Sequence, residues 1–353
     1  MAGTQVVAEM AEQPAVLAAI IARRESIHAE VRAALPQTLR GVALIARGSS
    51  DNVAVHARYL LELAAGLPVS LVAPSLVTRY GFVTDMRDHL VVALSQSGRT
   101  PEIVDVAGRF ADGGACVVAV TNEADSPLAD VAAVTLSVGT SRELAVPATK
   151  TVTGQLALVT LLAEAAGADG ALDPFTGGPT AWAQLVDAVA QTLSDTDPLD
   201  AAVALLASKG SGIHLARGLT YAAALEGALK AKETTRGIHE GFSSADFLHG
   251  PLTVASPEVA VIAYGATGPV LVDVAETARA AVALGSPVIG VGHPDVAAGM
   301  DGAIGVPTPQ GLGEALAVIP LVVRGQQLAI RTTLALGSDP DAPQGLNKVT
   351  ATH

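Results

Sequence analysis

Short apolar runs alternate with amphipathic helical patterns along most of the chain. The apolar runs predict strands at residues 42–46, 90–94, 116–121, 133–138, 213–216, 259–264 and 287–291. Helical periodicity predicts helices at residues 51–65, 100–111, 149–166, 219–236, 269–283 and 312–336. Because strands that alternate with helices are typical of βαβ units, we expect an α/β fold with mostly parallel sheets flanked by helices.

The two halves of the chain resemble each other across a glycine-rich segment, residues 167–180, which we interpret as a linker. Ile45-Ala46-Arg47-Gly48 ends the first strand of one half, and Leu215-Ala216-Arg217-Gly218 ends that of the other. Val104-Asp105-Val106-Ala107 is matched by Val272-Asp273-Val274-Ala275, although chance matches are common in an Ala- and Val-rich chain. The first repeat precedes a long helix in both copies, so we favour a duplicated α/β domain.

Hydroxyl-rich residues follow one of the predicted buried strands, in the segment Leu94-Ser95-Gln96-Ser97-Gly98-Arg99-Thr100-Pro101. Pro101 suits the first position of the helix that comes next. A strand-to-helix turn of this kind offers free backbone N–H groups and the positive end of a helix dipole, which together favour an anion. We therefore expect this loop to bind a small phosphate ester.

A second loop of the same kind, Gly48-Ser49-Ser50-Asp51-Asn52, follows the first predicted strand. Its hydroxyl and carboxylate groups could instead cap a helix, which is a common use of such residues. Two such loops in one half favour a ligand, because ligands bind at the carboxyl ends of the strands in open α/β sheets. The phosphate-binding motif G-x-x-x-x-G-K-[ST] of nucleotide-binding proteins does not occur.

The overall charge narrows the choice of partners. A formal net charge of -13 argues against nucleic acid or an anionic membrane as a partner, so local residues have to form any phosphate site.

No uncharged apolar run reaches the roughly 18 residues of a membrane span, and the first residues lack a secretory signal pattern, so we expect a cytoplasmic protein. The eight histidines show no metal-ligand spacing. Neither a metal nor a cofactor is implied.

A second group of candidate residues lies in the other half. Glu226, Lys230 and Glu233 share one face of a predicted helix, which makes them either a solvated ladder of charges or a partly desolvated proton carrier with its neighbours. The small apolar residues around them indicate a packed helix and favour the second interpretation. His249 lies in the turn Leu248-His249-Gly250-Pro251 and is either a structural histidine or an acid/base group.

Taken together, these motifs resemble the sugar isomerase (SIS) superfamily. The resemblance rests on residues 94–100, Glu143-Leu144-Ala145-Val146-Pro147-Ala148-Thr149-Lys150, residues 224–233 and His249-Gly250-Pro251. Within the superfamily, the chain resembles the double-SIS portion of glucosamine-6-phosphate synthases and, more closely still, the stand-alone double-SIS glucosamine-6-phosphate deaminases. The resemblance implies two tandem flavodoxin-like SIS domains at residues 31–166 and 196–338. An N-terminal helical segment (1–30), a linker and helix (167–195) and a C-terminal tail (339–353) complete the implied organisation.

The resemblance also implies roles for single residues. Those that match the family's sugar-phosphate ligands are Ser49, Ser50, Ser95, Gln96, Ser97 and Thr100. Val146 matches a sugar-contacting residue, Ala148 stands where the synthase has a serine, and Arg99 replaces a glutamate.

Three further residues match the family's catalytic groups. Glu233 matches the carboxylate that moves a proton between C1 and C2, with Glu226 and Lys230 as its charged neighbours. His249 matches a ring-opening histidine that the family supplies from the neighbouring subunit, so the resemblance implies a homodimer. Lys348 matches the C-terminal lysine that meets the ketose carbonyl, although a lysine near a chain end is ordinarily just solvated.

The reaction expected from the resemblance is that of a phosphosugar isomerase and deaminase. The sequence has no counterpart of the synthase's amidotransferase domain, so we expect glucosamine 6-phosphate to give fructose 6-phosphate and free ammonia. One alternative is a related enzyme acting on another amino-sugar phosphate or, as a deglycase, on a fructosamine phosphate. Another is a non-catalytic sugar-phosphate sensor, which the joint presence of Glu233, His249 and Lys348 disfavours.

Overall fold

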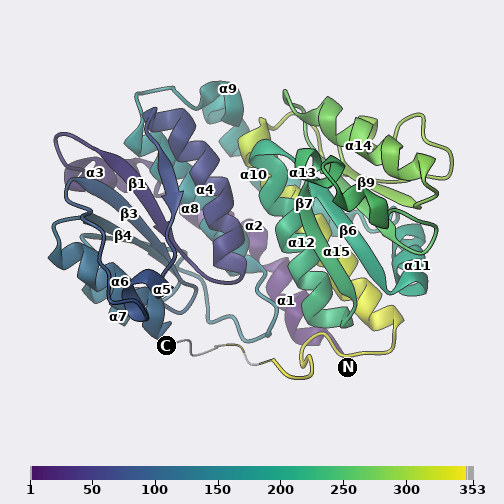
Figure 1. Cartoon of the computed structure of the whole chain (residues 1–353), viewed down its shortest axis with the longest axis horizontal. Helices are drawn as coiled ribbons and strands as arrows, with labels where there is room; N and C mark the ends of the chain where they lie inside the picture. Colours follow the sequence, from purple (N-terminus) through teal and green to yellow (C-terminus); the bar gives the residue numbers. More distant parts are fainter. Residues whose placement is uncertain (1, 347, 349–353) are drawn as a thin grey trace. The chain divides into compact units, whose positions relative to one another are not determined.

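The computed structural model describes residues 2–346 and Lys348, which form two compact units. The first unit consists of Ala15–Glu143, Lys150–Asp173 and, from the tail, Lys348. The second unit consists of the residues up to Pro14, Leu144–Thr149 and Pro174–Leu346. Each unit therefore combines segments that lie far apart in the sequence (Figure 1).

The first unit is built on a five-stranded sheet whose neighbouring strands all run parallel. The strand order β2-β1-β3-β4-β5 is that of the flavodoxin-like, doubly wound fold. Its elements, with the helix that leads into it, are α2 (Gln13–Ile21), α3 (Arg24–Ala34), β1 (Gly41–Ile45), α4 (Ser49–Ala65), β2 (Val69–Leu71), α5 (Ser75–Thr78), β3 (His89–Leu94), α6 (Pro101–Asp112), β4 (Cys116–Thr121), α7 (Pro127–Asp130), β5 (Val134–Ser137) and α8 (Lys150–Ala166).

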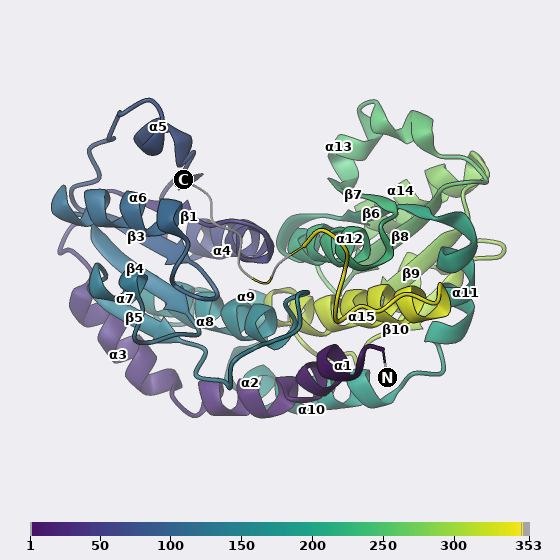
Figure 2. The ribbon, with the colours of Figure 1, turned by 90° about the horizontal axis from the view of Figure 1, so that it is seen from below.

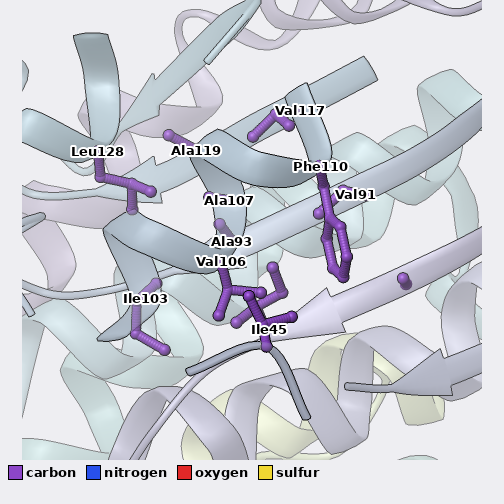
Figure 3. Close-up of a cluster of buried hydrophobic side chains, with 12 residues drawn as sticks. Ile45, Val91, Ala93, Ile103, Val106, Ala107, Phe110, Val117, Ala119 and Leu128 are labelled. Carbon is purple, nitrogen blue, oxygen red and sulfur yellow. The ribbon is translucent and has the colours of Figure 1, made fainter. Parts of the chain in front are cut away.

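Helices cover both faces of this sheet. Alternate residues of β1, β3 and β4 pack against α5, α6 and α7, where Ile103 and Phe110 of α6 lie in the buried cluster (Figure 3). On the other face, α4 and α8 contact the same strands. Since both faces are buried, the central strands are apolar throughout rather than alternating, which is why apolar runs predict them.

The second unit repeats this topology. Its five strands are all parallel in the order β10-β9-β8-β6-β7, which is the order of the first sheet when the strands are numbered from β6. Helices α12 and α15 lie side by side on one face (Figure 2). Its elements, with α9 at its edge, are α1 (Thr4–Ala11), α9 (Asp173–Thr176), α10 (Gly178–Ser194), α11 (Leu199–Lys209), β6 (Ser211–Ala216), η1 (Gly218–Thr220), α12 (Tyr221–Thr235), β7 (Ile238–Ser243), α13 (Ser244–Leu248), η2 (Pro251–Val254), β8 (Ala260–Gly265), α14 (Leu271–Ala283), β9 (Val288–Gly292), η3 (Pro294–Val296), β10 (Ile304–Pro307) and α15 (Glu314–Ala335).

The repeats found in the sequence occupy equivalent places in the two units. Arg47 follows the first strand of its unit and pairs with Glu102 in the first turn of α6, at 3.0 Å. Arg217 follows the first strand of the other unit and pairs with Asp273 in the first turn of α14, also at 3.0 Å. Each arginine thus joins the end of the first strand to the helix after the third, which supports a duplication.

The sequence predictions lack three strands and the helices α5, α7, α11 and α13, and they assign one helix start to a linker. The missed strands β2, β7 and β10 are edge strands that are short or carry polar residues, because an edge strand needs no continuous apolar run. The predicted linker at residues 167–180 contains α9 and the first turn of α10. Gly177, with φ at 85°, is the N-cap of α10 and Pro179 lies in its first turn, so residues that elsewhere break helices begin one here.

Among the described residues, no single helix has both the length and the apolar character of a membrane span. One pair, Thr4–Ile21 followed by Arg24–Ala34, meets these criteria on length and composition when taken together, and it is bent by 60°.

Candidate functional site

The loop at residues 95–100 connects β3 to α6, and hydrogen bonds join it to β4 and to α7. The Ser95 N–H donates to the carbonyl of Val120 in β4 at 3.1 Å, and the Leu128 N–H of α7 donates to the carbonyl of Gly98 at 3.1 Å. Gly98 has a φ of 61°, and a Cβ added to it would lie 2.1 Å from Ser126 Oγ. Only glycine therefore fits at this position of the loop.

The polar groups of this loop leave the start of α6 without a side-chain cap. Thr100 is the N-cap residue of α6, yet its side chain makes no capping hydrogen bond and lies 3.3 Å from Ser95 Oγ instead. Ser97 Oγ accepts a hydrogen bond from the Arg99 N–H at 3.2 Å, and Gln96 and Ser97 are partly exposed. The first N–H groups of α6 therefore remain available to an anion.

The second loop, at residues 48–52, shows the same feature. Gly48, with a φ of 61°, is the N-cap of α4, and no side chain caps the helix, so the capping alternative for Ser49, Ser50 and Asp51 is wrong. The buried Ser50 hydroxyl instead donates to Gln155 Oε1 of α8 at 3.0 Å. A Cβ on Gly48 would meet no atom within 4 Å, so open space lies beside this turn.

The two loops lie at the same place in the topology. They follow β1 and β3, which are neighbouring parallel strands and form the point where the strand order of the sheet reverses. Doubly wound sheets bind their ligands at such a switch point, outside the carboxyl ends of the strands. The loops of Ser49 and Ser95 thus lie at the carboxyl ends of neighbouring strands in the first unit.

A buried carboxylate of the first unit binds Lys348. Glu143, whose side chain is fully buried, accepts hydrogen bonds from the Thr151 N–H at 3.3 Å and the Thr151 hydroxyl at 2.7 Å. The Lys348 ammonium donates to the same carboxylate at 2.8 Å. Lys348 is therefore held in an ion pair and is not the solvated chain-end lysine that its position alone suggests.

Val146 and Ala148 belong to the second unit, in the short segment that follows Glu143. Both are partly exposed. The segment is anchored by Glu9 of α1, whose carboxylate accepts hydrogen bonds from the Leu144 N–H at 2.6 Å and the Ala145 N–H at 3.2 Å.

The charged face of α12 is not a solvated ladder. Lys230 and Glu226 are each 1% exposed, and the Lys230 ammonium lies 3.4 Å from Glu226 Oε1. It also donates to Glu233 Oε2 at 2.5 Å, while the Glu233 side chain remains 22% exposed. Because the lysine is buried and the last carboxylate is not, α12 presents one oriented, reachable carboxylate above a desolvated cation.

His249 ends α13 and is exposed, with its backbone N–H donating to the carbonyl of Asp246 at 3.1 Å. Within the part of the chain that the structure describes, no hydrogen bond or ion pair joins its ring to Glu233. The structure thus groups Glu233 with Lys230 and Glu226, and it leaves His249 on the surface of the same unit.

A buried chain of three aromatic side chains, which the sequence did not suggest, lies on the face of the second sheet that α12 covers. Tyr264 Oη lies 3.0 Å from His214 Nδ1, and His214 Nε2 lies 3.2 Å from His239 Nδ1. A Cβ on Gly227 of α12 would lie 2.3 Å from Tyr264 Oη, so the helix passes directly over this chain. Burial lowers the pKa of His239 to about 4, and burial beside His239 and Lys232 lowers that of His214 well below its usual value.

Acid is expected to destabilise the protein through this chain of side chains. The unfolded chain binds protons at these histidines below pH 6.5, whereas His239 in the folded protein does so only near pH 4. The free energy of unfolding should therefore fall, as the pH drops from 6.5 towards 4, by about 1.4 kcal/mol per pH unit for each histidine. Urea unfolding at several pH values measures the slope. His239→Asn, which keeps a polar partner for His214, should reduce it by one histidine's share, and an unchanged slope would contradict the assignment.

Two matching parallel sheets, both in the doubly wound strand order, place the chain among duplicated α/β proteins. The model of the SIS domain family matches residues 40–165 and 205–295, which is more than half of the chain. The chain belongs to this family.

Two relatives match most of this chain. The chain is 33% identical over 329 residues to a glutamine–fructose-6-phosphate aminotransferase (isomerizing) of Symbiobacterium thermophilum, covering 91% of this chain and 52% of the relative. A second such aminotransferase, from Pyrococcus horikoshii, is 31% identical over 310 residues and covers 87% of this chain and 51% of the relative. The chain thus spans about half the length of the curated relatives it matches.

Solved structures share the fold. The C-terminal domain of the glucosamine-fructose-6-phosphate aminotransferase of Francisella tularensis superposes with a TM-score of 0.83 at 21% identity, covering 95% of this chain and 97% of that one. A glucosamine-6-phosphate deaminase of Thermotoga maritima gives a TM-score of 0.71 at 18% identity, with coverage of 94% and 99%.

Proposed function

We propose that the chain is a phosphosugar aldose–ketose isomerase and deaminase that converts glucosamine 6-phosphate and water into fructose 6-phosphate and ammonia. The observation that carries the proposal is the ion pair on α12, where a buried Lys230 orients the reachable carboxylate of Glu233. The relatives support the substrate class, since their names describe isomerizing aminotransferases of fructose 6-phosphate.

The phosphate of the substrate is assigned to the switch point of the first unit. Ser49, Ser50 and the loop of Ser95, Gln96, Ser97 and Thr100 surround uncapped helix starts there, and Arg99 adds a positive charge beside them. Several N–H and O–H donors around one position suit the three acceptor oxygens of a phosphate monoester. Val146 is assigned to the sugar.

The reaction needs three tasks from side chains. A ring-opened sugar requires an acid/base group, which we assign to His249, and we expect a homodimer in which this exposed histidine acts across the interface. A proton has to move between C1 and C2, which we assign to the Glu233 carboxylate. The carbonyl or imine has to be polarised, which we assign to Lys348, with Glu143 holding its ammonium at 2.8 Å.

A panel of phosphorylated sugars assayed for ammonia release tests the proposal. Glucosamine 6-phosphate should give ammonia and fructose 6-phosphate in equal amounts, whereas the unphosphorylated sugar should give neither. Ammonia from galactosamine 6-phosphate alone, or glucose 6-phosphate from a fructosamine phosphate, would identify one of the related enzymes instead. Saturable phosphosugar binding without turnover of any member would identify a sensor and overturn the enzymatic proposal.

A further inference from the structure

The carboxyl group of Glu314 fills the position in the second unit that corresponds to the proposed phosphate position of the first unit. Glu314 is the first residue of α15 and is 5% exposed. Its Oε2 would lie 2.3 Å from a Cβ built on Gly268, and its Oε1 would lie 3.4 Å from one built on Gly218. The carboxyl group therefore lies against two glycine-containing loops at once.

These two loops are the topological counterparts of the two phosphate loops. Gly218 follows the first strand of its unit as Gly48 does, and both have a φ of 61°. Gly268 lies between the third strand and the helix after it, as residues 95–100 do in the first unit. The difference is in what fills the space, because the position beside Gly48 is open and the position beside Gly218 holds Glu314 Oε1.

The helix that follows the fifth strand begins with a basic residue in the first unit and with an acidic residue in the second. α8 and α15 each follow the fifth strand of their sheet. The first residue of α8 is Lys150, and the first residue of α15 is Glu314. The topologically equivalent position thus holds a lysine in the unit whose switch point is open and a glutamate in the unit whose switch point is filled.

The carboxyl group is poorly satisfied where it lies. Its Oε1 atom is buried and has no hydrogen-bond partner. The backbone N–H of Leu219 donates a hydrogen bond to the carboxyl group. Burial raises the pKa of Glu314 to about 7, and the Leu219 N–H opposes that rise. A buried carboxyl oxygen without a partner costs stability, so the side chain of Glu314 is held between the two loops at the expense of the fold.

We propose that the second unit contains a latent oxyanion site, formed by the loops at Gly218 and Gly268, and that the side chain of Glu314 occupies it as an internal substitute for a phosphate. The chain then offers a single open phosphate position although its fold has two. Removing the carboxyl group should make the second position available to a phosphate- or sulfate-sized anion.

Calorimetric titration with inorganic phosphate tests the proposal. Glu314→Ala is expected to bind one phosphate per chain more than the wild-type protein does, whatever number the wild type binds. Glu314→Gln keeps the volume of the side chain and should add no site. Glu314→Ser is a second variant with the same expectation as the alanine variant, and circular dichroism verifies that each variant is folded.

The location of the new site is tested by soaking crystals of the variant with selenate. An anomalous selenium peak between the loops at Gly218 and Gly268, absent from wild-type crystals, would support the proposal. Folded Glu314→Ala and Glu314→Ser proteins with the wild-type phosphate stoichiometry, or a wild-type protein that binds selenate at this position, would overturn it. Because the readout is a difference between variants, an inactive or phosphate-free wild type would contradict the proposed function and leave this test intact.

Discussion

Replacing Glu233 with glutamine is expected to lower kcat for ammonia release from glucosamine 6-phosphate by about 10²–10⁴-fold, the usual contribution of a general acid–base group. Glutamine keeps the size of the side chain and can still accept a hydrogen bond from Lys230, but it cannot take up a proton from a sugar carbon. KM should change little, because the phosphate contacts are assigned to other residues. Steady-state assays of both constants measure the effect.

The matched control for this variant is Glu240→Gln. Glu240 is a carboxylate of the same unit whose side chain is 56% exposed and lies 3.9 Å from Lys232 at the surface. It should retain wild-type kcat and KM. If Glu233→Gln instead raised KM with kcat unchanged, the carboxylate would bind substrate without moving a proton, and the catalytic assignment would be lost.

Replacing Lys230 with methionine is expected to lower the free energy of unfolding by about 3–5 kcal/mol, because it removes one partner of a buried ion pair and leaves the other charge uncompensated. Glu226 is 1% exposed, so its carboxylate cannot recover its hydration without disrupting the helix packing. Methionine matches the length of the lysine stem and leaves no large cavity. Urea denaturation at pH 7.5 measures the change.

Two further variants separate the charge effect from a general effect of the substitution. Lys230→Met combined with Glu226→Gln should regain part of the lost stability, because the uncompensated carboxylate is then gone. Lys232→Met, on the same helix but with a side chain that is 42% exposed, should change the free energy of unfolding by less than about 0.5 kcal/mol. A loss below about 1 kcal/mol for Lys230→Met would mean that the pair is hydrated in solution.

The central strands and the long helices could be predicted because their sequence signals are local. The apolar runs mark β1, β3, β4, β6, β8 and β9, which are central strands buried on both faces, and also the edge strand β5. The edge strand β7 contains His239 and Glu240 and has no apolar run, so periodicity could not find it. Its place in the sheet is set by pairing with β6, which is a contact between segments and not a property of either one.

The same distinction applies to the candidate site. The loops at Ser49 and Ser95 could be found because the hydroxyls, the glycine and the start of the helix are neighbours in sequence. The ion pair between Glu143 and Lys348 joins residues 205 positions apart, and only the resemblance singled out the lysine. The chain of Tyr264, His214 and His239 takes one residue from each of three strands, so no spacing in the sequence could reveal it.

The position of α1 has a consequence for how the protein is made. Its first residues bind the far end of the second unit, because Asp339 accepts a hydrogen bond from the Gly3 N–H across 336 positions and Asp341 accepts one from the Val6 N–H. A ribosome adds about 5–20 residues per second, so α1 leaves it roughly 20–70 s before these partners exist. Its buried residues, Val6 and Met10, are exposed throughout that time. Assembly of the second unit is thus completed only after residues 339–341 have been made, and α1 can bind a chaperone until then.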